Sequence, residues 1–331
     1  MRELIINKPE LQIYINLIQN AGITVSYPLY NLPLLSARVH DQGYRIDVLA
    51  RERDFREFLK DKREFLDELP TYRDFKECFL ASSIICYSNV EDFLKKLELY
   101  NELTKGVVFS PDTNVLYHRF ISHFKPLGNY GMIIVDLVKR EIENSMNFKY
   151  HPADIRALKR ILHHGELLDE LHNKRKKKSR KAAYIALREF EKLKDRAIEV
   201  ESIKEETRTN DELIVKTLKR VDRENAPLTV LLTADIAMTD IAELEGVEYF
   251  LFEYPHGDMG EVFATPYQFR SLLFNLAAVF GVIQVNRAYI FGEFGGKSKL
   301  NELKIALRGR YEEMKFHLGI CREIEKLEIK R

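Results

Sequence analysis

Apolar and polar positions change their spacing repeatedly between residues 107 and 252. Four short, continuous apolar runs occur at Val107–Phe109, Met132–Val135, Thr229–Leu232 and Tyr249–Phe252, and segments with helical spacing of apolar residues separate them. Continuous runs of this length that alternate with helices are typical of parallel strands covered on both faces. The pattern therefore predicts an α/β fold, in which a parallel sheet is flanked by helices.

The flanking segments follow other patterns. Residues Ser36–Ala50 alternate around Asp41-Gln42-Gly43, which predicts a β-hairpin with its turn at that tripeptide. After Pro255 the chain is apolar, and Lys299–Lys330 has the spacing of one long amphipathic helix. We expect three regions, which are an α+β N-terminal domain at 1–104, the α/β domain at 105–255 and a mainly helical C-terminal extension at 256–331.

A helical, highly charged insertion is expected within the α/β domain at 150–206. It contains "KRKKKSRK", in which seven of eight residues are basic, and without those seven the 52 basic residues fall to 45 against 51 acidic ones. A mostly acidic chain with one concentrated basic segment favours contact with a polyanion, and a solvated helix face is the alternative. The residues expected to bind RNA are Lys174, Arg175, Lys176, Lys177, Lys178, Arg180 and Lys181.

Composition narrows the class of protein. The chain has 331 residues with 45% apolar content, enough for a sizeable core, and its apolar runs are shorter than the ~20 residues that span a bilayer. The N-terminus lacks the order of a signal peptide, so we expect a cytoplasmic protein with no membrane partner, and a homo-oligomer is possible. Three cysteines suit reduced thiols better than a disulfide frame or a zinc site.

Two predicted strands end in a carboxylate. Asp112 follows the strand in "VVFSPDTN", and Asp235 follows the strand in "TVLLTAD". The carboxyl ends of parallel strands form the edge of the sheet where ligands bind. Both acids are therefore expected at the same edge.

Two helices add a carboxylate each. At about 100° per residue, Glu141 falls on the side of Leu137 and Val138, and Asp211 falls on the side of Ile214 and Leu218. An ionised carboxylate on an inward face is costly unless a cation compensates it. Together with the strand-end acids, this predicts a site for Mg²⁺ or Mn²⁺, which prefer hard oxygen ligands.

Each acid also has a simpler explanation. Asp112 could cap the helix that starts near Val115, and Asp211 could favour a helix N-terminus through the dipole. Glu141 could pair with Lys139 or Arg140, and Asp235 could be a turn residue. What favours the metal site is that four separate explanations would otherwise have to direct four acids toward one edge.

The segments "VVFSPDTNVLYHRF", "MIIVDLVKREIE", "TNDELIVKTL" and "VLLTADIAMTDIAELEGVEYFLF" resemble the successive blocks of PIN-domain nucleases. The resemblance covers roughly Gly106 to Tyr254. It implies a metal-dependent endoribonuclease, in which metal-activated water hydrolyses single-stranded or structured RNA. On matching positions it also implies a set of site residues: Asp112, Glu141, Asp211 and Asp235 as catalytic metal ligands, Asp240 as a possible fifth acid, and Thr113, Asn114 and Thr233 as supporting residues.

The chain departs from compact members of this family, because 70 residues separate Glu141 from Asp211. In flap-type nucleases, which share a related core, a helical arch that grips single-stranded substrate lies in a similar place. Those enzymes carry D-x-D and E-x-E acids that are not found in this sequence, so an endoribonuclease is preferred. The alternatives are a flap-type DNA nuclease and a non-catalytic PIN-like protein that binds RNA or ribonucleoprotein.

Overall fold

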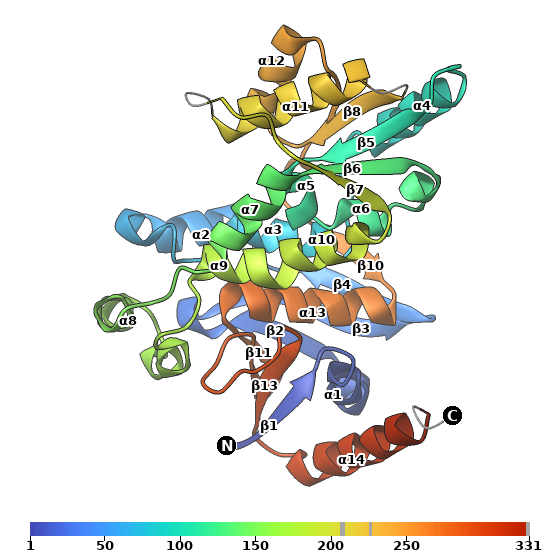
Figure 1. The fold of residues 1–331 in the computed structure, drawn as a ribbon. Helices are drawn as coiled ribbons and strands as arrows, with labels where there is room; N and C mark the ends of the chain where they lie inside the picture. The colour runs from blue at the N-terminus through green and yellow to red at the C-terminus, as the bar shows by residue number, and fades with distance from the viewer. Residues whose placement is uncertain (206–208, 225–226, 329–331) are drawn as a thin grey trace. The chain divides into compact units, whose positions relative to one another are not determined.

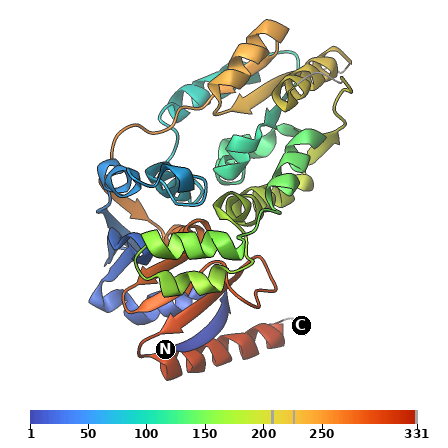
Figure 2. The same ribbon diagram turned by 90° about the vertical axis from the view of Figure 1, so that its left-hand side faces the viewer.

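The computed structural model describes residues 1–205, 209–224 and 227–328, which form two compact units. The terminal unit comprises residues 1–84, 148–180 and 258–331, and the central unit comprises residues 85–147 and 181–257. Figures 1 and 2 show the two units as ribbons. Among the helices that the structure describes, none combines the length and the apolar composition needed to cross a bilayer.

An antiparallel sheet of eight strands forms the terminal unit, in the order β1-β13-β12-β11-β2-β3-β4-β10. Its strands are β1 (Arg2–Asn7), β2 (Ile23–Tyr27), β3 (Leu32–His40), β4 (Gly43–Val48), β10 (Glu261–Ala264), β11 (Val282–Val285), β12 (Ala288–Phe291) and β13 (Glu302–Leu307). The predicted hairpin is confirmed, since β3 and β4 pair from His40 opposite Gly43. N-terminal and C-terminal segments thus build one sheet together.

This sheet has an internal symmetry that the sequence pattern did not predict. The elements β1-α1-β2-β3-β4 and β10-α13-β11-β12-β13 follow the same plan, with α1 at Leu11–Ile18 and α13 at Pro266–Phe280. The counterparts are β1 and β10, β2 and β11, β3 and β12, and β4 and β13. If each strand is replaced by its counterpart, the strand order of the sheet is reversed and every strand pair is again a pair of neighbours. The segments that lead from these helices into the next strand both end on a glycine with positive φ, Gly22 at 78° and Gly281 at 85°, a conformation that side chains rarely adopt.

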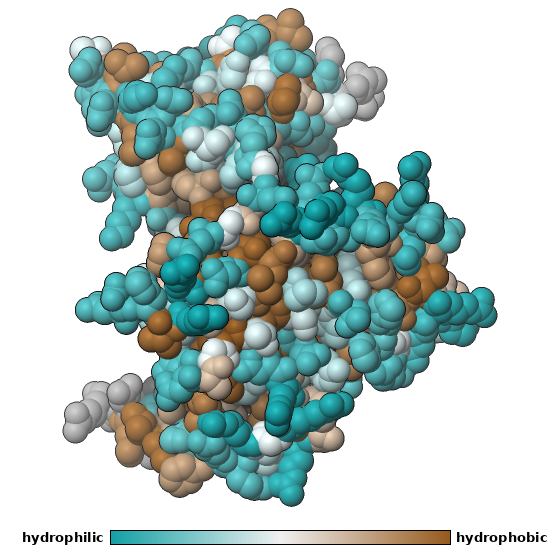
Figure 3. Space-filling view, turned by 180° about the vertical axis from the view of Figure 1, so that it is seen from behind, coloured by the Kyte–Doolittle hydropathy of each residue, from teal (hydrophilic) through white to brown (hydrophobic). Residues whose placement is uncertain are grey.

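Helices cover this sheet and fill its core with aromatic rings. They are α2 (Glu52–Leu59), α3 (Tyr72–Leu80), α8 (Pro152–Ile161), the start of α9 (Lys177–Lys181) and α14 (Tyr311–Glu328), besides α1 and α13. Phe55, Phe75 and Phe280 are buried and in mutual ring contact. Helix α14 buries Met314 and Leu318, while Phe316 and Ile320 stay exposed, and Figure 3 shows brown, hydrophobic atoms at the surface of this helix at its lower left.

The C-terminal region, predicted to be mainly helical, contributes strands β10, β11, β12 and β13 to this sheet besides its helices α13 and α14. Residues Glu302–Leu307, expected as the start of a long helix, form strand β13, and α14 begins only at Tyr311. The strand pairs with β1 on one side and β12 on the other. Residues 303–307 are all buried, Lys304 and Ala306 included, which fits a strand in the interior of a sheet better than one face of an amphipathic helix.

A parallel sheet of five strands forms the centre of the other unit, in the order β7-β6-β5-β8-β9. The strands are β5 (Val107–Pro111), β6 (Gly131–Val135), β7 (Ala197–Val200), β8 (Leu228–Thr233) and β9 (Glu248–Leu251). The helical segments are α4 (Val90–Asn101), α5 (Thr113–Tyr117), α6 (Phe120–His123), η4 (Lys125–Asn129), α7 (Asp136–Ser145), a π-helical turn (Ala182–Ala186), α10 (Leu187–Lys194), α11 (Asn210–Glu224) and α12 (Ile236–Glu245). The predicted α/β fold is therefore confirmed, including all four predicted strands.

The grouping of the chain departs from the expected division into three regions. The segment 1–104 divides after residue 84, and the expected insertion 150–206 divides after residue 180. Strand β7, within that insertion, pairs with β6 as a regular part of the parallel sheet. The reason lies in strand pairing, because partners such as β1 and β13 come from opposite ends of the chain.

Candidate active site

Two carboxylates lie at the carboxyl edge of the parallel sheet. Asp112 directly follows β5 and is the N-cap of α5, and Asp235 follows β8 and is the N-cap of α12. Strands β5 and β8 are parallel neighbours, with Pro111 opposite Leu232. Both acids therefore emerge at the same edge, as the sequence predicts.

Asp112 is held in place by its neighbours. Its side chain is only 1% exposed, and it accepts hydrogen bonds from the Val115 N–H at 2.8 Å and from the Thr233 hydroxyl at 2.5 Å. Burial raises the pKa of Asp112 to about 6, although these bonds and one with Asn114 oppose the shift. The bond to Val115 shows that the simpler explanation also holds, because Asp112 does cap α5.

Thr233 connects the two strand-end acids. Its hydroxyl donates to Asp112 and accepts a hydrogen bond from the Asp235 N–H at 3.0 Å. Asp235 is half-buried, and its carboxylate accepts from the Ala237 N–H at 2.9 Å. A buried threonine thus fixes the spacing between the ends of β5 and β8.

The two helical acids lie next to the strand-end acids. Glu141, half-buried on α7, accepts a hydrogen bond from the Thr113 hydroxyl at 2.7 Å. Asp211 is half-buried in the first turn of α11, and its pKa is raised by burial and then by the charges of Glu141 and Asp235. The charge of Asp235 also raises the pKa of Asp112. The four carboxylates therefore interact with one another electrostatically.

Basic residues do not balance this charge. Within the part of the chain that the structure describes, none of the four acids forms an ion pair. The cations proposed as simpler partners of Glu141 are engaged elsewhere, since Lys139 lies 3.7 Å from Glu199 and Arg140 pairs with Asp136. The acids repel one another, and the described residues supply no counter-charge.

Asp136 is an acid at this edge that sequence analysis did not single out. It directly follows β6, is buried, pairs with Arg140 and accepts from the Ser202 N–H at 2.9 Å. Its place after a predicted strand was the available signal, the same one that identified Asp112. Because a cation and a backbone donor satisfy Asp136, its role here is structural.

The chemistry of these side chains fits a hard divalent cation. Four oxygen donors from four elements, an uncompensated negative charge and raised pKa values at Asp112 and Asp211 are all relieved by Mg²⁺ or Mn²⁺. Among the described residues, however, no three His, Cys, Asp or Glu side chains stand close enough together to hold a metal ion as they are placed. The carboxylate oxygens of Asp112, Glu141 and Asp235 instead accept hydrogen bonds from threonine hydroxyls and backbone N–H groups.

Asp240, the possible fifth acid, is placed differently. It is exposed on α12, and the group whose pKa its charge helps to raise is Tyr249 on β9, which donates to Glu243. A helix advances 100° per residue, so five residues carry Asp240 away from the direction of Asp235. Its participation in the site stays a prediction.

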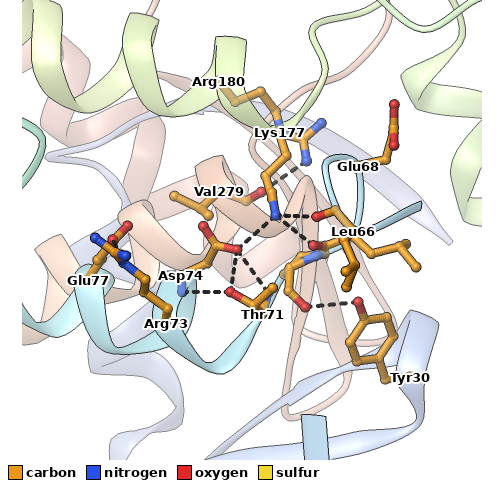
Figure 4. A network of polar contacts seen from close by, with 12 residues as sticks. Tyr30, Leu66, Glu68, Thr71, Arg73, Asp74, Glu77, Lys177, Arg180 and Val279 are labelled. Carbon is orange, nitrogen blue, oxygen red and sulfur yellow. Dashed lines mark hydrogen bonds and ion pairs between the residues drawn. The ribbon is translucent and has the colours of Figure 1, made fainter. Parts of the chain in front are cut away.

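The basic run is mostly part of the structure of the terminal unit (Figure 4). Lys177 is 8% exposed, and its ammonium donates to Asp74 at 2.9 Å and to the carbonyls of Leu66 and Leu69 at 2.9 and 2.7 Å. Arg180 is 1% exposed and donates to the carbonyls of Ala278, Val279 and Arg175 at 2.9, 2.9 and 2.7 Å. The prediction that these two residues bind RNA is wrong, because internal acceptors already use their charge.

The other basic residues of the run vary in exposure. Lys176 is half-buried and pairs with Glu68 and Asp154, Arg175 lies 4.0 Å from Glu293, and Lys181 lies 6.0 Å above the Tyr117 ring. Lys174 is half-buried, and Lys178 is exposed. Neither a continuous RNA-binding surface nor a solvated helix face describes this segment.

Comparison with known proteins agrees with this geometry. A parallel sheet with acids at its carboxyl edge defines a class of α/β proteins that bind ligands at that edge. More specifically, a PIN domain family model matches residues 109–252, which contain all four acids. The chain thus contains a PIN domain within flanking regions, and PIN domains are generally nucleases that use divalent metals. No curated protein matches the chain.

Proposed function

We propose that this protein is an endoribonuclease that depends on Mg²⁺ or Mn²⁺. The observation that carries the proposal is the set of four carboxylates, delivered by four elements to one sheet edge, with no compensating cation among the described residues. A site of this kind lowers its free energy by binding a divalent cation and an anionic substrate together.

The side chains of the site would have two roles, metal binding and the positioning of the metal ligands. Asp112, Glu141, Asp211 and Asp235 would hold the metal, which when bound supplies Lewis acidity toward water and the phosphodiester. Thr233 positions Asp112, and Thr113 positions Glu141, through the hydrogen bonds described above. Because the pKa of Asp112 is about 6, a proton competes for this carboxylate below that pH, and activity should fall there.

Cleavage of RNA tests the proposal. Single-stranded and structured RNA would be incubated with Mg²⁺ or Mn²⁺ and, separately, with chelator, using the wild-type protein and Asp112→Asn. We expect metal-dependent cutting that falls about 100-fold or more in the variant, as for loss of a group that acts on the transition state. Equal activity of both proteins, or no cutting of any RNA with Mn²⁺, would exclude it.

The lack of three converging metal-ligand side chains in the described residues favours a second candidate, a PIN protein that binds RNA without cutting it. For that protein, binding should persist in chelator and fall steeply with salt. Forked DNA in the same assay tests a flap-type activity, which faster cutting of DNA than of RNA would indicate.

A further inference from the structure

The central unit has a hollow of about 310 Å³ at the beginning of strands β6 and β7. Its wall is formed by η4 and the preceding residues and by the last turn of α10 with the residues after it. The lining includes Phe124, Lys125, Gly128, Lys192, Leu193 and Arg196. All of these belong to one compact unit.

Three cations face this hollow and no carboxylate does. Lys125, Lys192 and Arg196 are exposed, and none of them forms an ion pair with any residue in the described ranges. One guanidinium nitrogen of Arg196 donates to the Leu127 carbonyl at 3.4 Å, which holds that side chain at the rim. Lys192 also complements the negative C-terminal end of α10, but Lys125 and Arg196 lie outside that helix.

An aromatic ring accompanies the cations. Phe124 is half-buried and stacks on Phe120, with ring centroids 4.7 Å apart and planes at 21°. Cations beside an aromatic side chain are the usual composition of a surface for single-stranded nucleic acid, where phosphates meet the charges and bases meet the rings. We propose that this hollow binds the phosphate backbone of single-stranded RNA, an inference that rests on the proposed function.

The hollow lies at the opposite edge of the sheet from the carboxylates. The acids follow the carboxyl ends of β5 and β8, whereas η4 leads into β6 and α10 leads into β7. A strand of five residues is about 17 Å long at ~3.3 Å per residue. At ~3.4 Å per stacked nucleotide, the bound phosphate would lie about five nucleotides from the one that is cut. The hollow would therefore favour long substrates over short ones.

Gly128 provides a variant that acts on the hollow alone. A Cβ atom at this position meets no other atom within 4 Å, so a side chain can be added without displacing the backbone. Gly128→Glu places a carboxylate among the three cations, and Gly128→Ala is the matched control. A second variant removes the cations (Lys125→Ala, Lys192→Ala, Arg196→Ala), with Lys194→Ala as its control, because exposed Lys194 does not line the hollow.

Binding of fluorescent RNA would be measured by anisotropy in chelator, with single strands of about 12 and about 4 nucleotides. We expect Gly128→Glu and the triple variant to raise the Kd for the long strand at least tenfold, and both controls to change it less than twofold. The Kd for the short strand should rise in the same two variants, because in chelator the carboxylates hold no metal and the hollow is the proposed contact that remains. The triple variant should also lower the salt dependence by about two, at ~0.7 per phosphate contact on single strands.

Long-strand affinity equal to wild type in Gly128→Glu and in the triple variant would overturn the inference, as would a wild-type protein that binds no RNA. The cleavage assay is independent of this result. Metal-dependent cutting together with unchanged binding would refute the hollow and leave the proposed function standing. Weaker RNA binding by Gly128→Glu and by the triple variant, together with no cutting of any RNA, would refute the proposed nuclease activity and leave the hollow as an RNA-binding site.

Discussion

Two sets of buried charge differ in how the protein compensates them. In the terminal unit, Lys177 has a carboxylate and two carbonyls as partners, and Arg180 has three carbonyls. In the central unit, Asp112, Glu141 and Asp235 accept hydrogen bonds, and none of the four acids forms an ion pair within the described residues. Both arrangements bury charged groups away from water. Among the described residues, partners that compensate the buried charge are present only in the first arrangement.

The difference separates structural charges from functional ones. A buried cation with a full set of acceptors is costly to remove but has no remaining capacity for a ligand. Carboxylates whose negative charges help to raise the pKa values of Asp112 and Asp211 leave an uncompensated charge that an external cation can neutralise. The basic run in the sequence draws attention to the first set, Lys177 and Arg180. The lack of an ion pair among the described residues identifies the second set, the four carboxylates.

The largest expected effect is on stability, from Lys177→Met. The change leaves the Asp74 carboxylate and two carbonyls without their cation, and breaking a buried pair of this kind costs about 3–5 kcal/mol. Urea unfolding measures it, and Lys178→Met, at an exposed neighbour, should stay within about 0.5 kcal/mol. Adding Asp74→Asn should restore part of the loss. A cost below about 1 kcal/mol for Lys177→Met would remove the contrast between the two sets.

Divalent metal should stabilise the protein through the acidic set. At a Mn²⁺ concentration of about 100 times the Kd, the free energy of unfolding should rise by about 2.7 kcal/mol. Asp112→Asn should lose most of this gain in a thermal or urea titration. Asp240→Asn is the matched control, because Asp240 is an exposed acid on the helix that follows Asp235. Equal loss in both variants would mean that Asp240 belongs to the site.

Asp112 should make stability depend on pH. Its folded pKa of about 6 lies above the ordinary value of ~3.9, so between these values the folded state holds a proton that the unfolded state has released. The free energy of unfolding therefore falls as pH rises through this window, by up to about 3 kcal/mol, and the loss is complete above pH 6. In chelator, Asp112→Asn should gain about 1–3 kcal/mol relative to wild type between pH 4.5 and 7.5. A difference that stays constant with pH would contradict the assigned cause.

The smallest effect is expected from the exposed part of the basic run. Changing Lys174 and Lys178 to Gln should alter the free energy of unfolding by less than about 0.5 kcal/mol, because neither residue makes an ion pair with a described residue. If RNA reaches these residues, the salt dependence of binding should fall by about one. No change in an anisotropy titration against salt would exclude Lys174 and Lys178 from RNA contact.

The parallel sheet and its acids were predictable because their signals are local. Continuous apolar runs identified β5, β6, β8 and β9, and a carboxylate directly after a strand identified Asp112 and Asp235. Inward helical positions likewise indicated Glu141 and Asp211, which do lie near the strand-end acids. Their number, type and order in the chain were enough to indicate a PIN domain.

The terminal unit was much harder to predict, since its partners are far apart in sequence. Lys177 meets Asp74, 103 residues earlier, and Arg180 meets Ala278, 98 residues later, so no local pattern marks either as buried. Leu303, Ile305 and Leu307 fit a strand, but Lys299–Lys330 as a whole fits a helix. Only pairing with β1 and β12 decides between the two.

Strand β1 pairs with β13, and β10 pairs with β4, so the first strand of each set lies beside the last strand of the other set. This arrangement has a consequence for biosynthesis. Arg2 lies opposite Leu307, so β1 pairs with a strand that is synthesised about 300 residues later. At ~5–20 residues per second, β1 waits about 15–60 s for β13, its neighbour in the described sheet. The central sheet is complete in sequence once β9 ends at Leu251, well before that point. A stop codon ahead of β13 would consequently release a chain with its parallel sheet encoded in full and with β1 lacking its partner β13.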